Sequence, residues 1–294
     1  MPAGRQPAAH PERESASPGG RDPDGASKGV GGKPAGQRQI DRHRCRIDVG
    51  RAQCHAHDLI ERGIRAGHFS CLIQRYRYAR RDSEGPLNVA YVPGVGDNVA
   101  PILRELGVPL TIVDPDDIPQ TDLSKFTAIV VGPRAYQASQ TLIDNNEYLL
   151  SYVRNGGRLV VQYGQNEMQR PGIMPYPVTL RQPAERVTDE NAPVTFTDPG
   201  SPLLNSPNKI TQADFTGWVQ ERSTYMPSTF DARYRTMLAM NDPGEQPNRA
   251  AILAARYGRG TYVYVPLALF RQLPAGVSGG ARIFANLLGG NQIK

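Results

Sequence analysis

One short segment holds the chain's only tryptophan together with several polar side chains. Trp218 is followed by an amide at Gln220, a carboxylate at Glu221 and a guanidinium at Arg222, and Tyr225 comes shortly after. An aromatic ring beside polar donors is a common arrangement for holding sugars and other polyols. If the segment is a strand, Trp218, Gln220 and Arg222 share one face. The alternative is structural, with Trp218 in the core and Glu221 paired with an arginine.

The residues that most often act as nucleophile and base are confined to one part of the chain. All five histidines and all three cysteines lie between His10 and Cys71. From residue 87 onward the chain cannot use a Cys-His mechanism, and a serine with only a carboxylate would lack a suitable base. We therefore predict no catalytic residue there. The alternative is an enzyme that works through carboxylates such as Glu167, Glu221 or Glu245.

Two groups of residues invite a metal-binding interpretation, and neither has a regular pattern. The first group matches no zinc finger or ribbon in its spacing, and it consists of His43, Cys45, Cys54, His55 and His57. The second is the acidic cluster Asp114, Asp116 and Asp117, but aspartate and proline after a strand are ordinary turn residues. The turn around Asp242 and Glu245 has the same interpretation. We predict no metal site and no cofactor.

A glycine pair after the first predicted strand suggests a dinucleotide-binding turn. Gly94 and Gly96 match the first two glycines of G-x-G-x-x-G, but Val99 stands at the third position, so the motif is incomplete. A tight turn is the favoured interpretation. The sequence also has no phosphate-binding G-x-x-x-x-G-K-[ST] and no G-x-S-x-G hydrolase motif.

From residue 87 onward, short aliphatic runs alternate with turns and helical spacing, which is typical of a parallel α/β sheet. The pattern predicts buried strands at residues 87–92, 109–113, 128–131 and 158–163, and helices at 99–106 and 142–153. Asn155, Gly156 and Gly157 end the second helix, because glycine adopts the left-handed conformation that a helix end requires. Four strands with crossovers predict a doubly wound, mainly parallel sheet, with any ligand at the carboxyl ends of its strands.

The sequence beyond residue 164 is irregular and rich in β-strand patterns. Strands are predicted at residues 194–197, 218–221, 236–240, 250–257 and 260–266, and a closing helix at 279–288. The last two strands form a hairpin around a glycine-rich turn. We therefore predict one α/β domain at residues 87–294 with a β-rich C-terminal extension.

Residues 1–86 differ from the rest in composition and charge. They hold 16 of the 34 Lys and Arg residues and 10 of the 28 Asp and Glu residues, so the net charge of +6 lies in this part. Low aliphatic content without periodicity predicts a disordered basic leader. One alternative is tethering to nucleic acid or an anionic surface near Tyr76 and Tyr78, which is less favoured because no known module surrounds them. Another is a mis-assigned start, in which the upstream reading frame is not the biological one.

Targeting signals are missing from the sequence as written. No apolar core of a signal peptide follows the first residues, and no run approaches the roughly 20 apolar residues of a membrane span. Three unpatterned cysteines indicate no disulfide framework. We predict a cytoplasmic protein without a membrane span, or a periplasmic or secreted one if the true N-terminus is missing.

Five stretches of the sequence carry a family resemblance. They are Val-Ala-Tyr-Val-Pro-Gly-Val-Gly-Asp (89–97), Val-Val-Gly-Pro-Arg-Ala-Tyr (130–136), residues 214–222, Arg-Tyr-Gly-Arg-Gly-Thr-Tyr-Val-Tyr (256–264) and Phe-Arg-Gln-Leu-Pro-Ala-Gly (270–276). Together they resemble the C-terminal region of large bacterial PIG-L (LmbE-like) deacetylases. The resemblance implies a class I glutamine amidotransferase-like, or ThuA-like, fold, which is a flavodoxin-like doubly wound sheet. Its motifs add Asp97, Arg134 and Tyr136 to the candidate ligand-binding residues.

The catalytic motifs of these families do not carry over. Such deacetylases have an N-terminal zinc-dependent N-acetylglucosaminyl hydrolase with an Ala-His-Pro-Asp-Asp motif, which residues 9–13 match only superficially because Arg13 replaces the second carboxylate. The amidotransferase fold keeps a cysteine at a sharp elbow after a strand and a histidine farther on. Residues 159–165 are predicted to be the matching stretch, and they contain neither.

The resemblance therefore implies a non-catalytic accessory domain that recognises a glycan or assembles with a deacetylase. The candidate ligand-binding residues are Trp218, Gln220, Glu221, Arg222, Tyr225, Asp97, Arg134 and Tyr136. The alternative is a ThuA-like carbohydrate-active enzyme that uses carboxylates.

Overall fold

The computed structural model describes residues 87–289, and the predicted leader at residues 1–86 lies outside them. The strands of its main sheet are β1 (Val89–Val92), β2 (Leu110–Ile112), β3 (Ala128–Val131), β4 (Arg158–Gln162), β10 (Arg235–Thr236), β12 (Leu253–Tyr257) and β13 (Gly260–Val265). Their order across the sheet is β10-β12-β13-β4-β3-β1-β2. The four predicted parallel strands are confirmed, each within a few residues of its predicted bounds.

The predicted hairpin is part of this main sheet. β12 pairs antiparallel with β13, with Tyr257 opposite Gly260, as the glycine-rich turn predicted. β13 also pairs in parallel with β4, so it becomes the fifth parallel strand. The assignment of both strands to a separate C-terminal extension is therefore wrong. Local pattern predicts the hairpin, but only long-range pairing decides which strand it joins.

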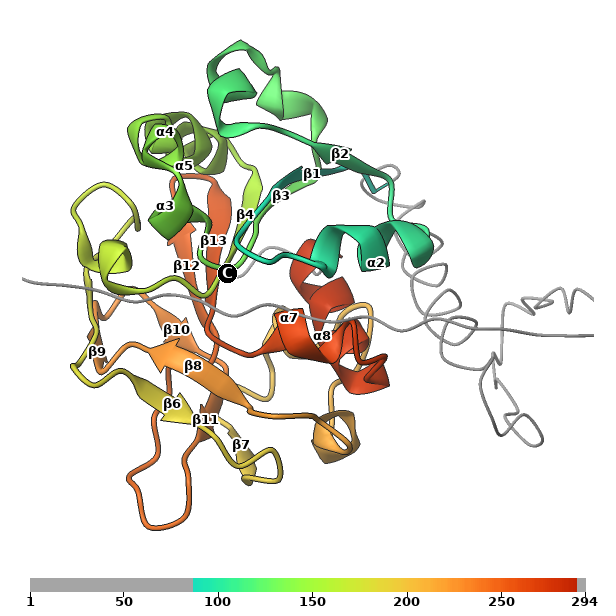
Figure 1. Ribbon diagram of the computed structural model, residues 1–294, viewed down its shortest axis with the longest axis vertical. Helices are drawn as coiled ribbons and strands as arrows, with labels where there is room; N and C mark the ends of the chain where they lie inside the picture. The colour runs from blue at the N-terminus through green and yellow to red at the C-terminus, as the bar shows by residue number, and fades with distance from the viewer. Residues whose placement is uncertain (1–86, 290–294) are drawn as a thin grey trace, which may run out of the picture. The chain divides into compact units, whose positions relative to one another are not determined.

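Helices cover both faces of the sheet. They are α2 (Val99–Glu105), α3 (Ala135–Ala138), α4 (Gln140–Asp144), α5 (Asn146–Arg154), α7 (Leu269–Gln272) and α8 (Ser278–Gly289). The core cluster on one face includes side chains of α2, α7 and α8, and that on the other includes side chains of α3, α4 and α5 (Figure 1). Because both faces are covered, β1 and β3 are buried at every residue, and their sequences read as continuous aliphatic runs.

The helix predicted at residues 142–153 is two helices. It begins earlier, at Gln140, and divides at Asn145, whose side-chain amide donates to the carbonyl of Pro115 in the loop after β2. Its predicted end is confirmed, because α5 stops at Arg154 and Gly156 adopts a φ of 112°. The break is set by a contact with a distant loop, which helical spacing cannot reveal.

The chain between β4 and β12 adds short elements beside the main sheet. These are β5 (Val178–Thr179), β6 (Glu185–Val187), β7 (Val194–Phe196), α6 (Pro202–Asn205), β8 (Ser223–Met226), β9 (Thr229–Phe230) and β11 (Leu238–Met240), with the 3-10 turns η3 (Asn166–Gln169) and η4 (Gln212–Phe215). Two further 3-10 turns, η1 (Pro115–Gln120) and η2 (Leu123–Lys125), lie between β2 and β3. β7 pairs with β11, β5 with β9 and β6 with β8, and these strands gather together in Figure 1. The central architecture is thus a mixed α/β sheet, mainly parallel, with β-rich insertions.

The strand predicted at residues 218–221 is wrong. Gly217 and Gln220 have φ values of 69° and 67°, so the backbone turns twice where a strand would stay extended. The strand β8 begins only at Ser223. Trp218, Gln220 and Arg222 therefore do not share a strand face.

The glycine pair after β1 is a turn packed against the loop after β3. A Cβ at Gly94 would lie 2.1 Å from the carbonyl oxygen of Pro133, and the Val95 amide donates to that same oxygen. Only glycine permits this approach. The two loops are held together at the carboxyl ends of β1 and β3, as the tight-turn interpretation expects.

Candidate functional site

The carboxyl ends of β3 and β4 meet at Arg134. Its backbone is left-handed, with φ of 58°, directly between β3 and α3. Its amide donates to the carbonyl of Tyr163, the residue after β4, at 2.8 Å. A strained strand-to-helix turn of this kind presents the nucleophile in many hydrolases. Here the elbow follows β3, not residues 159–165, and it presents an arginine.

Three aromatic rings, which we call the aromatic cluster, surround the end of β4. The Tyr163 ring stacks on Tyr225 at a centroid distance of 6.1 Å and contacts Phe270 at 4.9 Å. Tyr225 reaches this position through a left-handed backbone with φ of 51°. Tyr163 and Tyr225 are half-buried, so part of each ring remains available to a ligand. Burial raises the pKa of Tyr163, against the opposing effect of Arg134 and Arg271.

A buried carboxylate organises the arginines beside these rings. One oxygen of Glu221 accepts a hydrogen bond from Arg271 Nε at 2.7 Å, and the other accepts one from Arg186 at 2.5 Å. Arg271 also donates to the side chain of Gln220. The Glu221 side chain is only 3% exposed, so this charge is stable because two guanidinium groups compensate it.

A hollow lined by amide side chains adjoins Arg134. We call it the amide hollow; it has a volume of about 430 Å³ and is bounded by Tyr136, Gln137, Ala138, Gln140, Ile143, Gln165, Asn166, Glu167 and Arg170. Arg134 donates to Gln137, and Gln137 donates to Gln165. Amides and charged groups beside aromatic rings are the donors and acceptors that a polyhydroxylated ligand requires.

Two buried oxygens at this end of the sheet lack a hydrogen-bond partner among residues 87–289. They are Oε1 of Gln162, the last residue of β4, and Oγ of Ser223, which bridges to Leu267 just beyond β13. Buried polar atoms in native proteins usually have a hydrogen-bond partner, so these two oxygens mark a place where a further hydrogen bond can form. These two oxygens therefore support a candidate binding site at the carboxyl ends of the strands.

The aromatic cluster, Arg134, Glu221, Arg271 and the amide hollow together form what we call the carboxyl-end site. Five of the eight sequence-predicted residues lie there: Arg134, Gln220, Glu221 and Tyr225 at or beside the aromatic cluster, and Tyr136 in the lining of the amide hollow. They come from the loop after β3, from α3, and from residues 220–225, which lead into and form most of β8. Residues 220–225 reach the site because they pack against α7, where Arg271 bonds to Gln220 and Glu221.

Trp218 and Arg222 belong to the core instead. Trp218 is 3% exposed, stacks on Phe215 at 5.4 Å and donates from its indole to the carbonyl of Asp214. Arg222 donates to the carbonyls of Ala192 and Phe215, and burial lowers its pKa. The structure therefore confirms the alternative interpretation of this segment, in which Trp218 lies in the core and Glu221 pairs with arginines.

Tyr136 and Asp97 also have structural partners. The Tyr136 hydroxyl donates to Asn146 at 2.6 Å inside the protein, and burial raises its pKa. The Asp97 carboxylate accepts from the Tyr91 hydroxyl and from the amides of Gly94 and Val99. Asp97 thus closes the loop after β1 and leaves little capacity for a ligand.

Three site residues were not singled out from the sequence. Phe270 and Arg271 open one of the motifs that carry the family resemblance, and Tyr163 ends the stretch predicted as β4. The rule that ligands lie at the carboxyl ends of parallel strands would have favoured Tyr163. Nothing in the sequence pairs it with Tyr225, which is 62 residues away.

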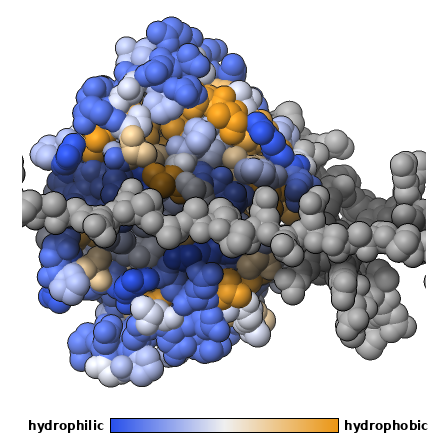
Figure 2. Space-filling view, viewed as in Figure 1, coloured by the Kyte–Doolittle hydropathy of each residue, from blue (hydrophilic) through white to orange (hydrophobic). Residues whose placement is uncertain are grey.

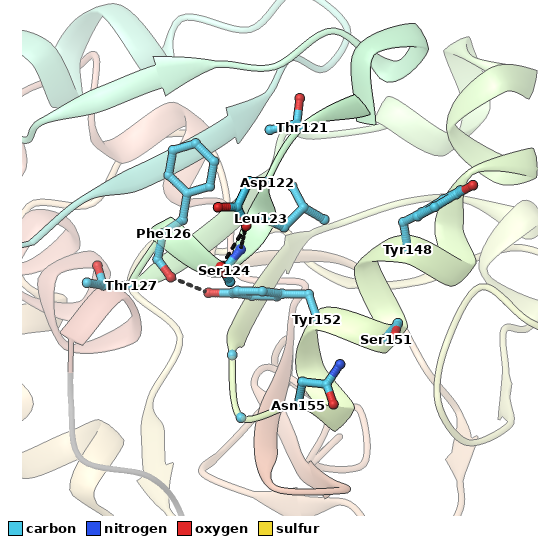
Figure 3. Close-up of a pocket in the computed structure, with 12 residues that line it drawn as sticks. Thr121, Asp122, Leu123, Ser124, Phe126, Thr127, Tyr148, Ser151, Tyr152 and Asn155 are labelled. Atoms are coloured by element: carbon cyan, nitrogen blue, oxygen red, sulfur yellow. Dashed lines mark hydrogen bonds between the residues drawn. The ribbon is translucent and has the colours of Figure 1, made fainter. Parts of the chain in front are cut away.

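A larger cavity lies at the opposite, amino end of the strands (Figure 3). Its volume is about 570 Å³, between η2 and α5, with Asn155, Gly156 and Gly157 on one wall. The Asp122 carboxylate caps Ser124, and the Tyr152 hydroxyl donates to the carbonyl of Phe126, as the dashed lines show. These polar groups are used within the protein itself, so size alone does not make this cavity the better candidate.

The carboxylates proposed for catalysis do not form a pair. Glu221 is held by arginines, Glu167 accepts from the amide of Gln165, and Glu245 lies on an exposed turn. Within residues 87–289 no three His, Cys, Asp or Glu residues gather in a way that could hold a metal ion. Over the same residues, no helix is long and apolar enough to cross a membrane.

Comparisons with known proteins give only distant similarity. No family model matches the sequence, and no curated protein matches it. Among solved structures, a β-galactosidase from Rahnella sp. R3 is 14% identical with a TM-score of 0.40, over 68% of this chain and 30% of its own. An exo-β-1,4-mannosidase from Opitutaceae bacterium strain TAV5 is 14% identical with a TM-score of 0.41, over 71% and 37%.

A β-galactosidase from the haloarchaeon Halorubrum lacusprofundi is also 14% identical, with a TM-score of 0.36 over 67% of this chain and 30% of its own. The chain spans about a third of the length of these solved proteins. At these identities and TM-scores the similarity assigns no activity to the chain.

Proposed function

We propose that residues 87–289 form a non-catalytic glycan-recognition domain with a class I glutamine amidotransferase-like, flavodoxin-like fold, akin to the accessory domain of PIG-L deacetylases. The order β2-β1-β3-β4-β13 of the parallel strands supports the fold, because flavodoxin-like sheets have the strand order 2-1-3-4-5. The absence of histidine and cysteine after Cys71 supports a role in binding.

The observation that carries this proposal is the group of three partly exposed rings formed by Tyr163 and its neighbours Tyr225 and Phe270. Such rings offer apolar faces to the C–H side of a sugar, while neighbouring amides and guanidinium groups bind its hydroxyls. Gln137 and Gln165 supply amides next to Arg134, and Arg271 and Gln220 supply further polar groups next to Phe270.

Assembly with a deacetylase is the second role implied by the family resemblance. The described surface gives it less support, because the large hydrophobic side chains exposed there are Val95, Ile112 and Tyr148. The face seen in Figure 2 is mostly hydrophilic, with hydrophobic surface in small separate areas. Stable permanent interfaces are usually larger and more apolar.

The test is calorimetric titration of the full chain with tetra-N-acetylchitotetraose, a neutral oligosaccharide. We expect saturable binding that Tyr163→Ala or Phe270→Ala weakens about tenfold. Tyr148→Ala is the matched control, since Tyr148 is 49% exposed on α5, away from the aromatic cluster. The proposal is wrong if no neutral or acidic oligosaccharide binds, or if Tyr148→Ala weakens binding as much as Tyr163→Ala.

Turnover is measured on the same samples. We expect neither release of acetate from the oligosaccharide nor cleavage of its glycosidic bonds. Either activity, if lost in Glu167→Gln or Glu221→Gln, would favour the carboxylate enzyme instead.

A further inference from the structure

The carboxyl-end site has an excess of positive charge. The arginines that belong to the site or contact its residues are Arg134, Arg170, Arg186, Arg222 and Arg271, and the carboxylates are Glu167, Asp189, Glu190 and Glu221. Glu221 binds both Arg186 and Arg271. The negative charges of Asp189 and Glu190 interact with the buried Arg222 and raise its pKa, against the larger lowering effect of burial. Among the described residues, Arg134 and the exposed Arg170 of the amide hollow form no ion pair with a carboxylate, and of these two Arg134 is the one beside Tyr163.

Arg134 is also held in a fixed place. Its amide is bonded to the carbonyl of Tyr163, and its Nε donates to Gln137 Oε1 at 2.6 Å. Within residues 87–289 its two terminal nitrogens have no protein acceptor. A guanidinium with free terminal N–H groups presents a planar fork that matches a carboxylate or phosphate. Because these bonds already restrict the Arg134 side chain, it loses little further conformational entropy when an anion binds.

Arg271 also lies close to the Tyr163 ring. It follows Phe270, whose ring contacts Tyr163, and it lies 5.0 Å from the Phe270 centroid. Burial raises the pKa of Tyr163, while the charges of Arg134 and Arg271 both lower it, so both arginines lie within electrostatic reach of that hydroxyl. The hydroxyl stays protonated at neutral pH and can donate to an anion.

We infer that the ligand of this site is an acidic saccharide, whose carboxylate or phosphate lies between Arg134 and Arg271 while a sugar ring stacks on the aromatic cluster. The inference rests on the proposed glycan function. It adds that the glycan carries a negative charge, because the aromatic rings and amides alone would suit a neutral glycan equally well.

The experiment compares three probes on the full chain by calorimetry. Tetra-N-acetylchitotetraose is neutral, a hyaluronan tetrasaccharide carries carboxylates on a backbone that also contains N-acetylglucosamine, and N-acetylglucosamine 6-phosphate carries a phosphate. We expect the better acidic probe to bind about tenfold more tightly than the neutral one, and this preference to shrink with added salt. The two acidic probes distinguish a carboxylate ligand from a phosphate ligand.

Arg134→Gln should remove the preference, weakening the acidic probe about tenfold to a hundredfold and the neutral probe by a smaller factor, since both lose a hydrogen-bond donor but only the acidic probe loses an opposite charge. Arg134→Lys, which keeps the charge without the fork, should restore part of it. Arg104→Gln, at an exposed arginine in α2, is the control and should leave all three affinities unchanged.

Equal affinity of the acidic and neutral probes, or an acidic preference that survives Arg134→Gln, would overturn the inference and leave the glycan function standing. Failure of all three probes to bind would instead overturn the proposed function and this inference with it.

Discussion

Glu221→Gln removes the charge that holds two arginines at the carboxyl-end site. Breaking a buried ion pair by removing one partner costs about 3–5 kcal/mol, whereas an exposed pair contributes about 0–1 kcal/mol. Glu221 is 3% exposed, but the side chains of Arg186 and Arg271 are 51% and 36% exposed, so water can rehydrate them. We therefore expect an intermediate loss of about 2 kcal/mol. In a domain of about 200 residues this lowers Tm by about 4–8 °C.

The assay is urea and thermal unfolding followed by circular dichroism. Glu147→Gln is the control, because the pair of Glu147 with Arg154 has side chains that are 68% and 38% exposed. Its stability should change by no more than about 0.5 kcal/mol. The double variant with Arg271→Gln should lose less than the sum of the single changes, since both remove one interaction. If Glu221→Gln unfolds at the same temperature as Glu147→Gln, the reasoning from burial fails.

Two further changes test the structural roles of sequence-predicted residues. Trp218→Ala should destabilise the domain by about 3–5 kcal/mol, because a buried ring and its indole hydrogen bond are lost; urea unfolding measures this, and a near-neutral result would contradict the core position. Asp242 accepts hydrogen bonds from the amides of Thr188 and Asp189, which lower its pKa although burial opposes them. Its contribution to stability is therefore present above the unfolded pKa of about 3.9 and is lost as pH falls through the lower folded pKa. The stability difference between the wild type and Asp242→Asn should shrink between about pH 7 and about pH 3; a pH-independent difference would exclude this linkage.

Much of the central sheet could be predicted from local pattern. β1, β3 and β4 read as aliphatic runs because both faces of each strand are covered, and Gly156 marks the end of α5 because its left-handed backbone suits glycine. The strand expected at Trp218 failed for a local reason, since Gln220 adopts a positive φ that its residue type does not favour. The division at Asn145 failed for a distant one, a hydrogen bond to Pro115.

The sequence by itself determined the alternation of strands and helices, the hairpin of β12 and β13, and the lack of imidazole and thiol beyond Cys71. Only the tertiary structure decided that β13 lies beside β4 and that Arg134, Tyr163 and Tyr225 meet. Local backbone preference and hydrophobic period act over a few residues, so they leave a signal in the sequence. Contacts between residues far apart in the chain arise from the packing of whole elements, and no local pattern encodes which partner each element finds.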